Sequence, residues 1–122
     1  MNYEEVFSLS PVDLISWLHN EFEVDLPTQV ETIEDMEKAS QSLLVLAQYF
    51  SYLSELLAYS KISVRNAKRY GPKEQWEDMV DRQTAIERRL DSIKQQYSAV
   101  SRAVTIKAER DKELNMNSPY SA

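Results

Sequence analysis

Residues 32–116 form two long amphipathic segments interrupted once, at Gly71-Pro72, and Gly71 is the only glycine among 122 residues. Proline biases the residue before it out of the helical region, and glycine commonly ends a helix. No residue on either side of this break, back to residue 32 or forward to residue 116, interrupts a helix. The sequence therefore predicts an all-α fold, a long antiparallel helical hairpin that resembles a coiled coil, with its turn at residues 71–72.

Helix-start signals divide the chain before the hairpin. Ser10-Pro11 is typical of a helix start, because serine caps the N-terminus and proline fits the first helical position. A short amphipathic helix over about residues 11–22 should follow, and Leu26-Pro27 should end this element. Thr28 and Thr32 each begin a capping-box pattern, so the first long helix starts at one or the other. We expect an acidic N-terminal segment over residues 1–31, the hairpin over 32–116 and a flexible tail over 117–122.

Apolar residues in both long segments recur at heptad spacing, which is typical of a packing seam. If the helices fold back at Gly71-Pro72, facing residues have numbers that sum to about 143. Ser60 and Gln83 are the polar exceptions in the two seams, and they satisfy this sum. We expect them to face each other and to share a hydrogen bond, forming a buried polar layer that fixes the register. The predicted seam includes Leu43, Leu46, Phe50, Leu53, Leu57 and Val64 of the first helix and Ile86, Leu90, Ile93, Tyr97 and Val100 of the second.

The first long helix carries a second apolar stripe outside the seam. Leaving it in water would forgo several kcal/mol at about 25 cal/mol per Å². The stripe can be covered in two ways. Either the short N-terminal helix lies across it in a three-helix monomer, or other copies of the chain pair with it in a dimer or ring. We favour other copies, because tyrosine is enriched at interfaces. This tyrosine stripe comprises Val45, Tyr49, Tyr52, Leu56 and Tyr59.

The net charge of −6 is unevenly distributed along the chain. Residues 1–40 hold ten acids against one lysine, whereas residues 61–122 hold thirteen bases against nine acids. One reading is that the two parts lie against each other and neutralise. The other is that they meet different partners, or neighbouring copies of the same protein.

A basic cluster lies at the predicted hairpin tip. Five bases occur in thirteen residues without an acid: Lys61, Arg65, Lys68, Arg69 and Lys73. Cations suit the negative C-terminal end of a helix, and the acids that follow can neutralise them. Alternatively, this basic tip binds phosphates and tracks a nucleic-acid backbone, although no base-reading motif accompanies it.

The composition argues against catalysis. One glycine, one histidine and no cysteine cannot supply phosphate-binding loops, thiolate sites or multi-histidine metal clusters. His19 is expected to lie on a solvated helix face. We therefore predict a protein that is not an enzyme and has no cofactor, no metal and no small-molecule substrate. No apolar run approaches the roughly 18 residues of a membrane span, and the N-terminus is acidic, so we expect a cytoplasmic protein without a signal peptide or membrane contact.

We expect a non-enzymatic interaction or assembly factor whose hairpin self-associates or docks onto a protein partner. In architecture alone, the hairpin with its short preceding helix and polar tail resembles the oligomerising centre of viral small terminase subunits and other small viral assembly factors. No residue matches a motif of those proteins. The resemblance implies a viral accessory protein located in the virion or the infected-cell cytoplasm. The alternatives are a nucleic-acid-binding oligomer of small-terminase or recombination-accessory type, using the basic tip, and an inhibitor of a host nucleic-acid enzyme acting through the acidic segment.

Overall fold

The computed structural model describes residues 1–27 and 29–116, apart from the side chains of residues 115 and 116. The predicted tail at 117–122 lies outside the described residues. No residue in the described ranges belongs to a strand, which confirms the all-α prediction. The four helices are α1 (Tyr3–Phe7), α2 (Pro11–Glu21), α3 (Ile33–Tyr70) and α4 (Lys73–Met116).

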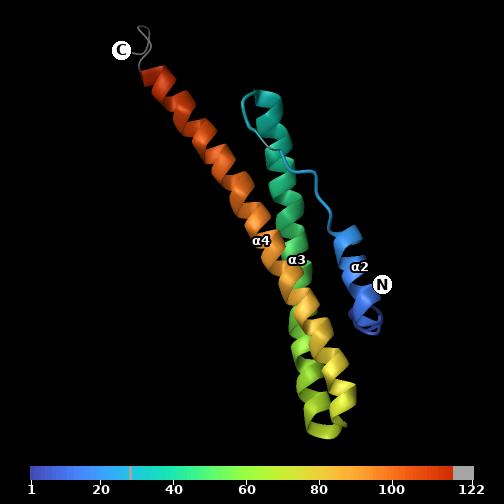
Figure 1. Cartoon of the computed structure of the whole chain (residues 1–122). Coiled ribbons are helices and arrows are strands. Elements are labelled where there is room, and N and C mark those ends of the chain that lie inside the picture. The colour runs from blue at the N-terminus through green and yellow to red at the C-terminus, as the bar shows by residue number, and fades with distance from the viewer. Residues whose placement is uncertain (28, 117–122) are drawn as a thin grey trace.

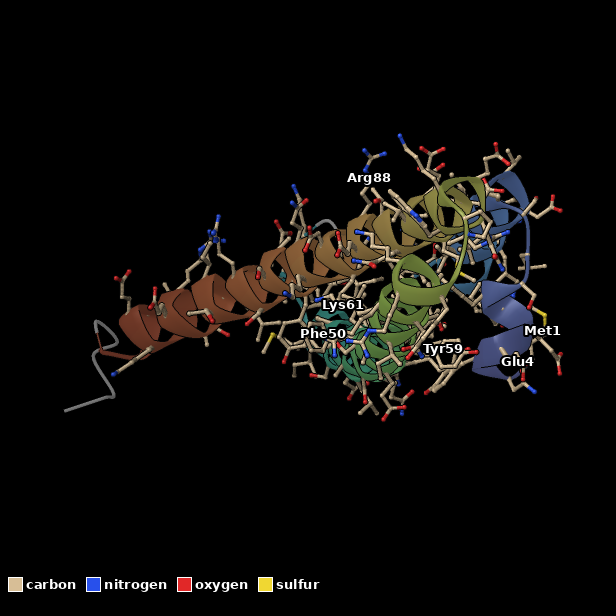
Figure 2. All side chains as sticks on the ribbon, turned by 90° about the horizontal axis from the view of Figure 1, so that it is seen from below. Met1, Glu4, Phe50, Tyr59, Lys61 and Arg88 are labelled. Atoms are coloured by element: carbon tan, nitrogen blue, oxygen red, sulfur yellow. The ribbon has the colours of Figure 1, made fainter. Side chains whose placement is uncertain are left out.

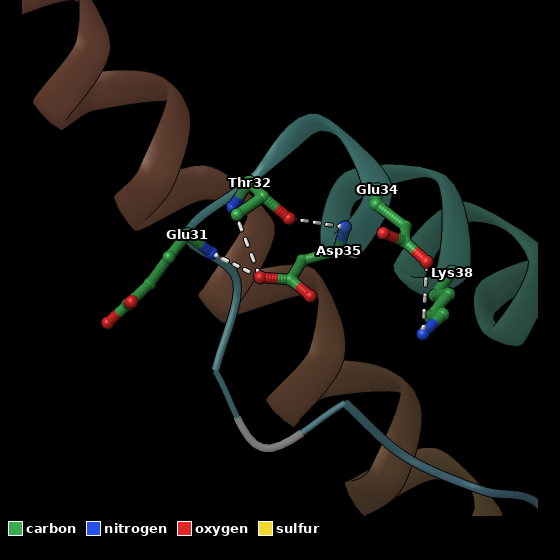
Figure 3. A network of polar contacts seen from close by, with 5 residues as sticks. All are labelled: Glu31, Thr32, Glu34, Asp35 and Lys38. Carbon is green, nitrogen blue, oxygen red and sulfur yellow. Dashed lines mark hydrogen bonds and ion pairs between the residues drawn. The ribbon is translucent and has the colours of Figure 1, made fainter.

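The long helix α3 begins at the second of the two predicted capping sites. Thr32 Oγ1 accepts a hydrogen bond from the Asp35 backbone N–H at 3.0 Å. Asp35 Oδ2 accepts in return from the backbone N–H groups of Thr32, at 3.1 Å, and Glu31, at 3.0 Å (Figure 3). These two bonds from the backbone favour the charged carboxylate and lower the pKa of Asp35. At α2 the prediction also holds, because Ser10 Oγ accepts from the N–H of Asp13.

The hairpin turns at Gly71-Pro72, as predicted, but the glycine is not there for a left-handed conformation. Gly71 has φ −120° and ψ 163°, an extended conformation that any residue adopts. Its N–H donates to the Ala67 carbonyl at 2.7 Å, and a Cβ added to Gly71 would lie 2.9 Å from that same oxygen. Close approach of the backbone is therefore what excludes a side chain at the turn.

From this turn, α3 and α4 run antiparallel and separate toward their other ends (Figure 1). The second helix is also longer, with 44 residues against 38. Side chains of both helices form the buried interior along the shared length. These are Ala39, Ser42, Leu46, Leu53, Leu56, Ser60 and Val64 of α3, and Ile86, Leu90, Ile93 and Val100 of α4.

The buried face of α3 is rotated relative to the predicted seam. Phe50 and Tyr97, both placed in the seam, are 38 % and 42 % exposed. Ser42 and Leu56, both outside it, are buried. The cause is a third layer, because α1 packs against α3 and α2 packs against α4 on one side of the hairpin. The core is therefore centred between the partner helix and this N-terminal layer.

The short helix α1 was not predicted. Asn2 Oδ1 caps it by accepting from the backbone N–H of Glu5 at 2.8 Å. Its own residues Val6 and Phe7 are buried. A five-residue helix is too short to be stable in isolation, so these buried contacts with the hairpin hold it in place.

Candidate interaction surfaces

The N-terminal arm, defined here as residues 1–22, covers the tyrosine stripe. Leu56 is fully buried, and Val45, Tyr49, Tyr52 and Tyr59 are half-buried. Of the two covers that the sequence left open, the structure has the intramolecular one. Pairing between copies through this stripe stays a prediction, and it would require α1 and α2 to leave the surface that they occupy in the single chain.

Aromatic rings of the arm pack directly against tyrosines of the stripe. Phe7 meets Tyr59 edge to face, with ring centroids 6.0 Å apart. Phe22, at the end of α2, meets Tyr49 at 5.0 Å and 90°. Edge-to-face pairs add roughly 0.5–1.5 kcal/mol each beyond the area that they bury. The arm is thus held by specific ring contacts and not only by general burial.

Polar contacts also join the arm to the hairpin. Arg82 Nε donates to the Leu9 carbonyl and Arg89 Nη2 donates to the Phe22 carbonyl, both at 2.6 Å. Burial lowers the pKa of Arg89 despite the opposing charge of Glu23. The two arginines that meet the acidic arm therefore bind its backbone.

A further polar contact lies at α1, where the Tyr3 hydroxyl donates to Glu55 Oε2. This hydrogen bond, with burial and the charge of Glu55, raises the pKa of Tyr3 to about 12. The protonated phenol is the form that holds α1 on α3.

Docking of the arm leaves the acidic segment without ion pairs. Residues 1–31 contain seven carboxylates and no lysine or arginine. Among the described residues, ion pairs are confined to three i,i+4 pairs within α3 or within α4: Glu34 with Lys38, Lys73 with Glu77, and Lys107 with Asp111. The seven side chains, which we call the acidic face, are all exposed: Glu4, Glu5, Asp13, Glu21, Glu23, Asp25 and Glu31.

The basic tip projects from the turn end of α3. Its five side chains are exposed. Lys73 pairs with Glu77 at 3.8 Å, and the Lys68 ammonium lies 5.2 Å from the Trp76 ring centroid. Lys61, Arg65, Lys68 and Arg69 form no ion pair with any carboxylate of the described residues. The acids that follow in the sequence therefore neutralise only one of the five bases by direct pairing.

A groove that sequence reasoning missed lies between α3 and α4. It has a volume of about 470 Å³ and a mainly apolar lining of Ala47, Phe50, Ile93, Lys94, Tyr97 and Ser98. The Lys94 ammonium lies 5.6 Å from the Phe50 ring centroid. Figure 2 shows Phe50 and Lys61 on one side of α3, and Tyr59, Glu4 and Met1 on the other. We call this surface the hairpin groove, and it faces away from the arm.

The predicted polar layer is present only in part. Ser60 is fully buried, but its hydroxyl donates to the Leu57 carbonyl of its own helix at 2.8 Å. Gln83 Nε2 donates to Glu87 Oε1 at 3.2 Å. No hydrogen bond of the described residues joins Ser60 to Gln83, so that expectation is wrong. Each side chain is satisfied within its own helix.

The single histidine lies on the rim of another hollow, between α2 and α4. His19 is exposed, and the hollow, of about 540 Å³, mixes Asp81 with Arg88 and Arg89 in its lining. The described residues bring together no group of three or more histidine, cysteine, aspartate or glutamate side chains placed to hold a metal ion. Nor is any described helix long and apolar enough to cross a membrane.

Comparison with protein-family models, with characterised proteins and with solved structures finds no match to this chain.

Proposed function

We propose that this chain is a non-enzymatic assembly factor, in which the hairpin groove of one copy receives the acidic face of another. The observation that carries the proposal is the separation of two complementary surfaces on opposite sides of one hairpin.

The basic partner in this contact is the hairpin groove and its extension toward the tip. Lys61, Arg65 and Lys68 follow Phe50 by 11, 15 and 18 residues, which are close to whole numbers of helical turns. They therefore continue along the groove side of α3, while Lys94 lies on its α4 wall. The groove thus has an apolar lining bordered by cations without ion pairs among the described residues. Such a groove can bind an apolar surface that carries carboxylates.

The acidic partner is the outer surface of the arm. It combines four of the seven exposed carboxylates, Glu4, Glu5, Asp13 and Glu21, with three exposed apolar side chains, Met1, Val12 and Ile15. The carboxylates of this surface complement the cations of the groove, and its exposed apolar side chains complement the apolar lining of the groove. Complementary potentials of this kind speed association and fix its orientation.

The relative position of the two surfaces predicts the type of assembly. A two-fold dimer uses the same patch on both copies, whereas a contact between different patches leaves one of each patch free at the ends. Since Phe50 of the groove and Glu4 of the acidic face lie on opposite sides of α3 (Figure 2), a contact between them is heterologous. It adds further copies until a ring closes, or else it continues as a filament.

The test uses one variant that blocks each surface. Phe50→Glu places a carboxylate in the groove, and Glu4→Lys/Glu5→Lys reverses two charges of the acidic face. The wild-type mass should rise with protein concentration and fall with salt, while each variant alone should stay at 14.2 kDa. An equimolar mixture should form a capped 1:1 complex and nothing larger, because each variant keeps one intact surface.

Leu44→Glu is the matched control, since it adds the same charge to the exposed back of α3 and should leave assembly unchanged. Light scattering or sedimentation gives the masses, and circular dichroism confirms that each variant is folded. A wild-type chain that remains monomeric at high concentration and low salt would reject the proposal. So would a mixture of the variants that forms no complex.

A second candidate function is nucleic-acid binding by the basic tip. It is favoured by the exposure of Lys61, Arg65, Lys68 and Arg69 without ion pairs in the described part of the chain. Binding should then weaken steeply with salt, and Lys61→Glu/Arg65→Glu should reduce the salt slope by about 2. Gel shifts with single- and double-stranded DNA and with RNA test this, and no shift at low salt excludes it.

A further inference from the structure

An aromatic hollow lies where α2 meets α3, beside the arm. It has a volume of about 340 Å³ and is lined by Trp17, Glu21 and Phe22 from the end of α2, by Tyr49 and Tyr52 from α3, and by Met1. Four of these six side chains are aromatic. This concentration of rings around one small space is distinct from the hairpin groove, which lies on the other side of α3.

The four rings pack against one another, two pairs of them nearly perpendicular and the two pairs that include Tyr52 tilted at 32° and 53°. Trp17 and Phe22 meet at 5.4 Å and 84°, and Phe22 and Tyr49 at 5.0 Å and 90°. Tyr52 completes the set at 5.7 Å from Phe22 and 6.4 Å from Trp17. Phe22 is only 4 % exposed and anchors the group, while the other three rings are half-buried. The walls of the hollow are therefore preformed aromatic surfaces.

The hollow has a negative electrostatic character. The face of an aromatic ring carries negative charge density, which attracts cations within about 6 Å of the ring centroid. Glu21 adds a carboxylate. Desolvation by burial, and after it the charge of Glu21, raises the pKa of Tyr52. Glu21 forms no ion pair with any cation of the described residues. The aromatic rings and the Glu21 carboxylate therefore line the same hollow.

We infer that this hollow binds an organic cation of the alkylammonium class, with the aromatic rings as a cage and Glu21 as the counter-ion. A methylated ammonium fits the site best, because it is large, weakly hydrated and matched to aromatic surfaces. Both a lysine side chain of another protein, bare or methylated, and a free quaternary amine carry this chemistry. The inference does not rest on the proposed assembly, but Glu21 and Met1 belong to both the hollow and the surface proposed to dock in the groove, so the two are tested separately.

The binding test uses Trp17 as an optical probe. The chain has two tryptophans, so Trp76→Phe leaves Trp17 as the only one and places the reporter in the wall of the hollow. Choline is the first probe, and 3,3-dimethyl-1-butanol, its neutral isostere, is the control for simple hydrophobic binding. Choline should change Trp17 fluorescence in a saturable way and bind about 3- to 30-fold more tightly than the alcohol.

Two matched substitutions distinguish binding in the hollow from attraction of the cation to the acidic segment as a whole. Glu21→Gln removes the carboxylate in the hollow, whereas Glu23→Gln removes the same charge two residues later, outside the lining. Glu21→Gln should weaken choline binding several-fold and Glu23→Gln should not. Equal binding of choline and the alcohol overturns the inference. Equal effects of the two substitutions, or no saturable response to any cation, also overturn it.

The same titration distinguishes the sources of the cation. Nα-acetyl-lysine amide and its trimethylated form represent a protein side chain, and choline represents a free amine. Tighter binding of the trimethylated lysine than of choline assigns the site to a modified protein, and the reverse order assigns it to a small molecule. The titration is made at protein concentrations where the chain is monomeric, so that self-association does not contribute to the change in Trp17 fluorescence.

Discussion

Replacing Leu56 by alanine tests directly whether the N-terminal arm covers the tyrosine stripe in solution. Leu56, a residue of the stripe that the arm covers, is fully buried, whereas Leu44 on the same helix is 61 % exposed. Truncating a fully buried leucine costs about 2–5 kcal/mol, through lost transfer free energy and the cavity left behind. The same change at an exposed position stays within about 0.5 kcal/mol. We therefore expect Leu56→Ala to cost about 3 kcal/mol and Leu44→Ala to be close to neutral.

A loss of stability of this size lowers the melting temperature by a readily measured amount. At about 2.1 cal/mol/K per residue, the unfolding entropy of this chain is about 0.26 kcal/mol/K, so a loss of 3 kcal/mol lowers Tm by about 12 °C. Calorimetry or circular dichroism at two protein concentrations measures both variants. The difference between Leu56→Ala and wild type should not depend on concentration, because the cover belongs to the same chain. A difference that grows with concentration, or equal losses for both variants, would refute the arm as the cover.

Two further predictions concern pH and the turn. Because the pKa of Tyr3 is raised from 10.0 to about 12, its contact with Glu55 stabilises fully below pH 10 and is lost as pH rises toward 12. The stability gap between wild type and Tyr3→Phe should close over that window in denaturant titrations, and a gap that stays constant contradicts the contact. Gly71→Ala should cost about 1 kcal/mol, since the new Cβ would meet the Ala67 carbonyl and Gln75 Oε1, both at 2.9 Å. The loss should persist in a Gln75→Ala background, and a neutral result in chemical denaturation would show that the backbone relaxes.

The helix boundaries could be predicted from sequence because capping is local. Ser10, Thr32 and Gly71 act through hydrogen bonds and sterics within a few residues of their own positions. Such signals need no knowledge of the rest of the fold. The hairpin followed from the same boundaries, since two long amphipathic helices joined by a tight turn have few other ways to bury their apolar faces.

Features that depend on a third element could not be predicted in the same way. The heptad pattern of α3 places Phe50 in the seam and Leu56 outside it, but docking of the arm moves the buried face toward Leu56. Periodicity records which positions are apolar and not which neighbour covers them. For the same reason, the tyrosine stripe could not distinguish an intramolecular cover from a second copy. The hairpin groove was missed because Phe50 and Tyr97 were both assigned to the interior.

The error at Ser60 and Gln83 has a geometric cause. Numbers that sum to a constant place two residues at the same height along the hairpin, but they do not fix the direction of each side chain. A serine in a helix can satisfy its hydroxyl on a carbonyl of the preceding turn, and Ser60 does so at Leu57. The α1 helix was missed for a related reason, since Val6 and Phe7 stabilise it only once the hairpin is present.

The way that Arg82 and Arg89 hold the arm has a consequence for how this protein can diverge. Both donate to main-chain oxygens, at Leu9 and Phe22, and such acceptors exist whichever amino acid occupies those positions. This part of the anchoring is therefore encoded in α4, and the arm can accumulate substitutions on its outer surface as long as its inward rings are kept. A lineage of such chains can acquire new specificity at that surface while its architecture stays the same.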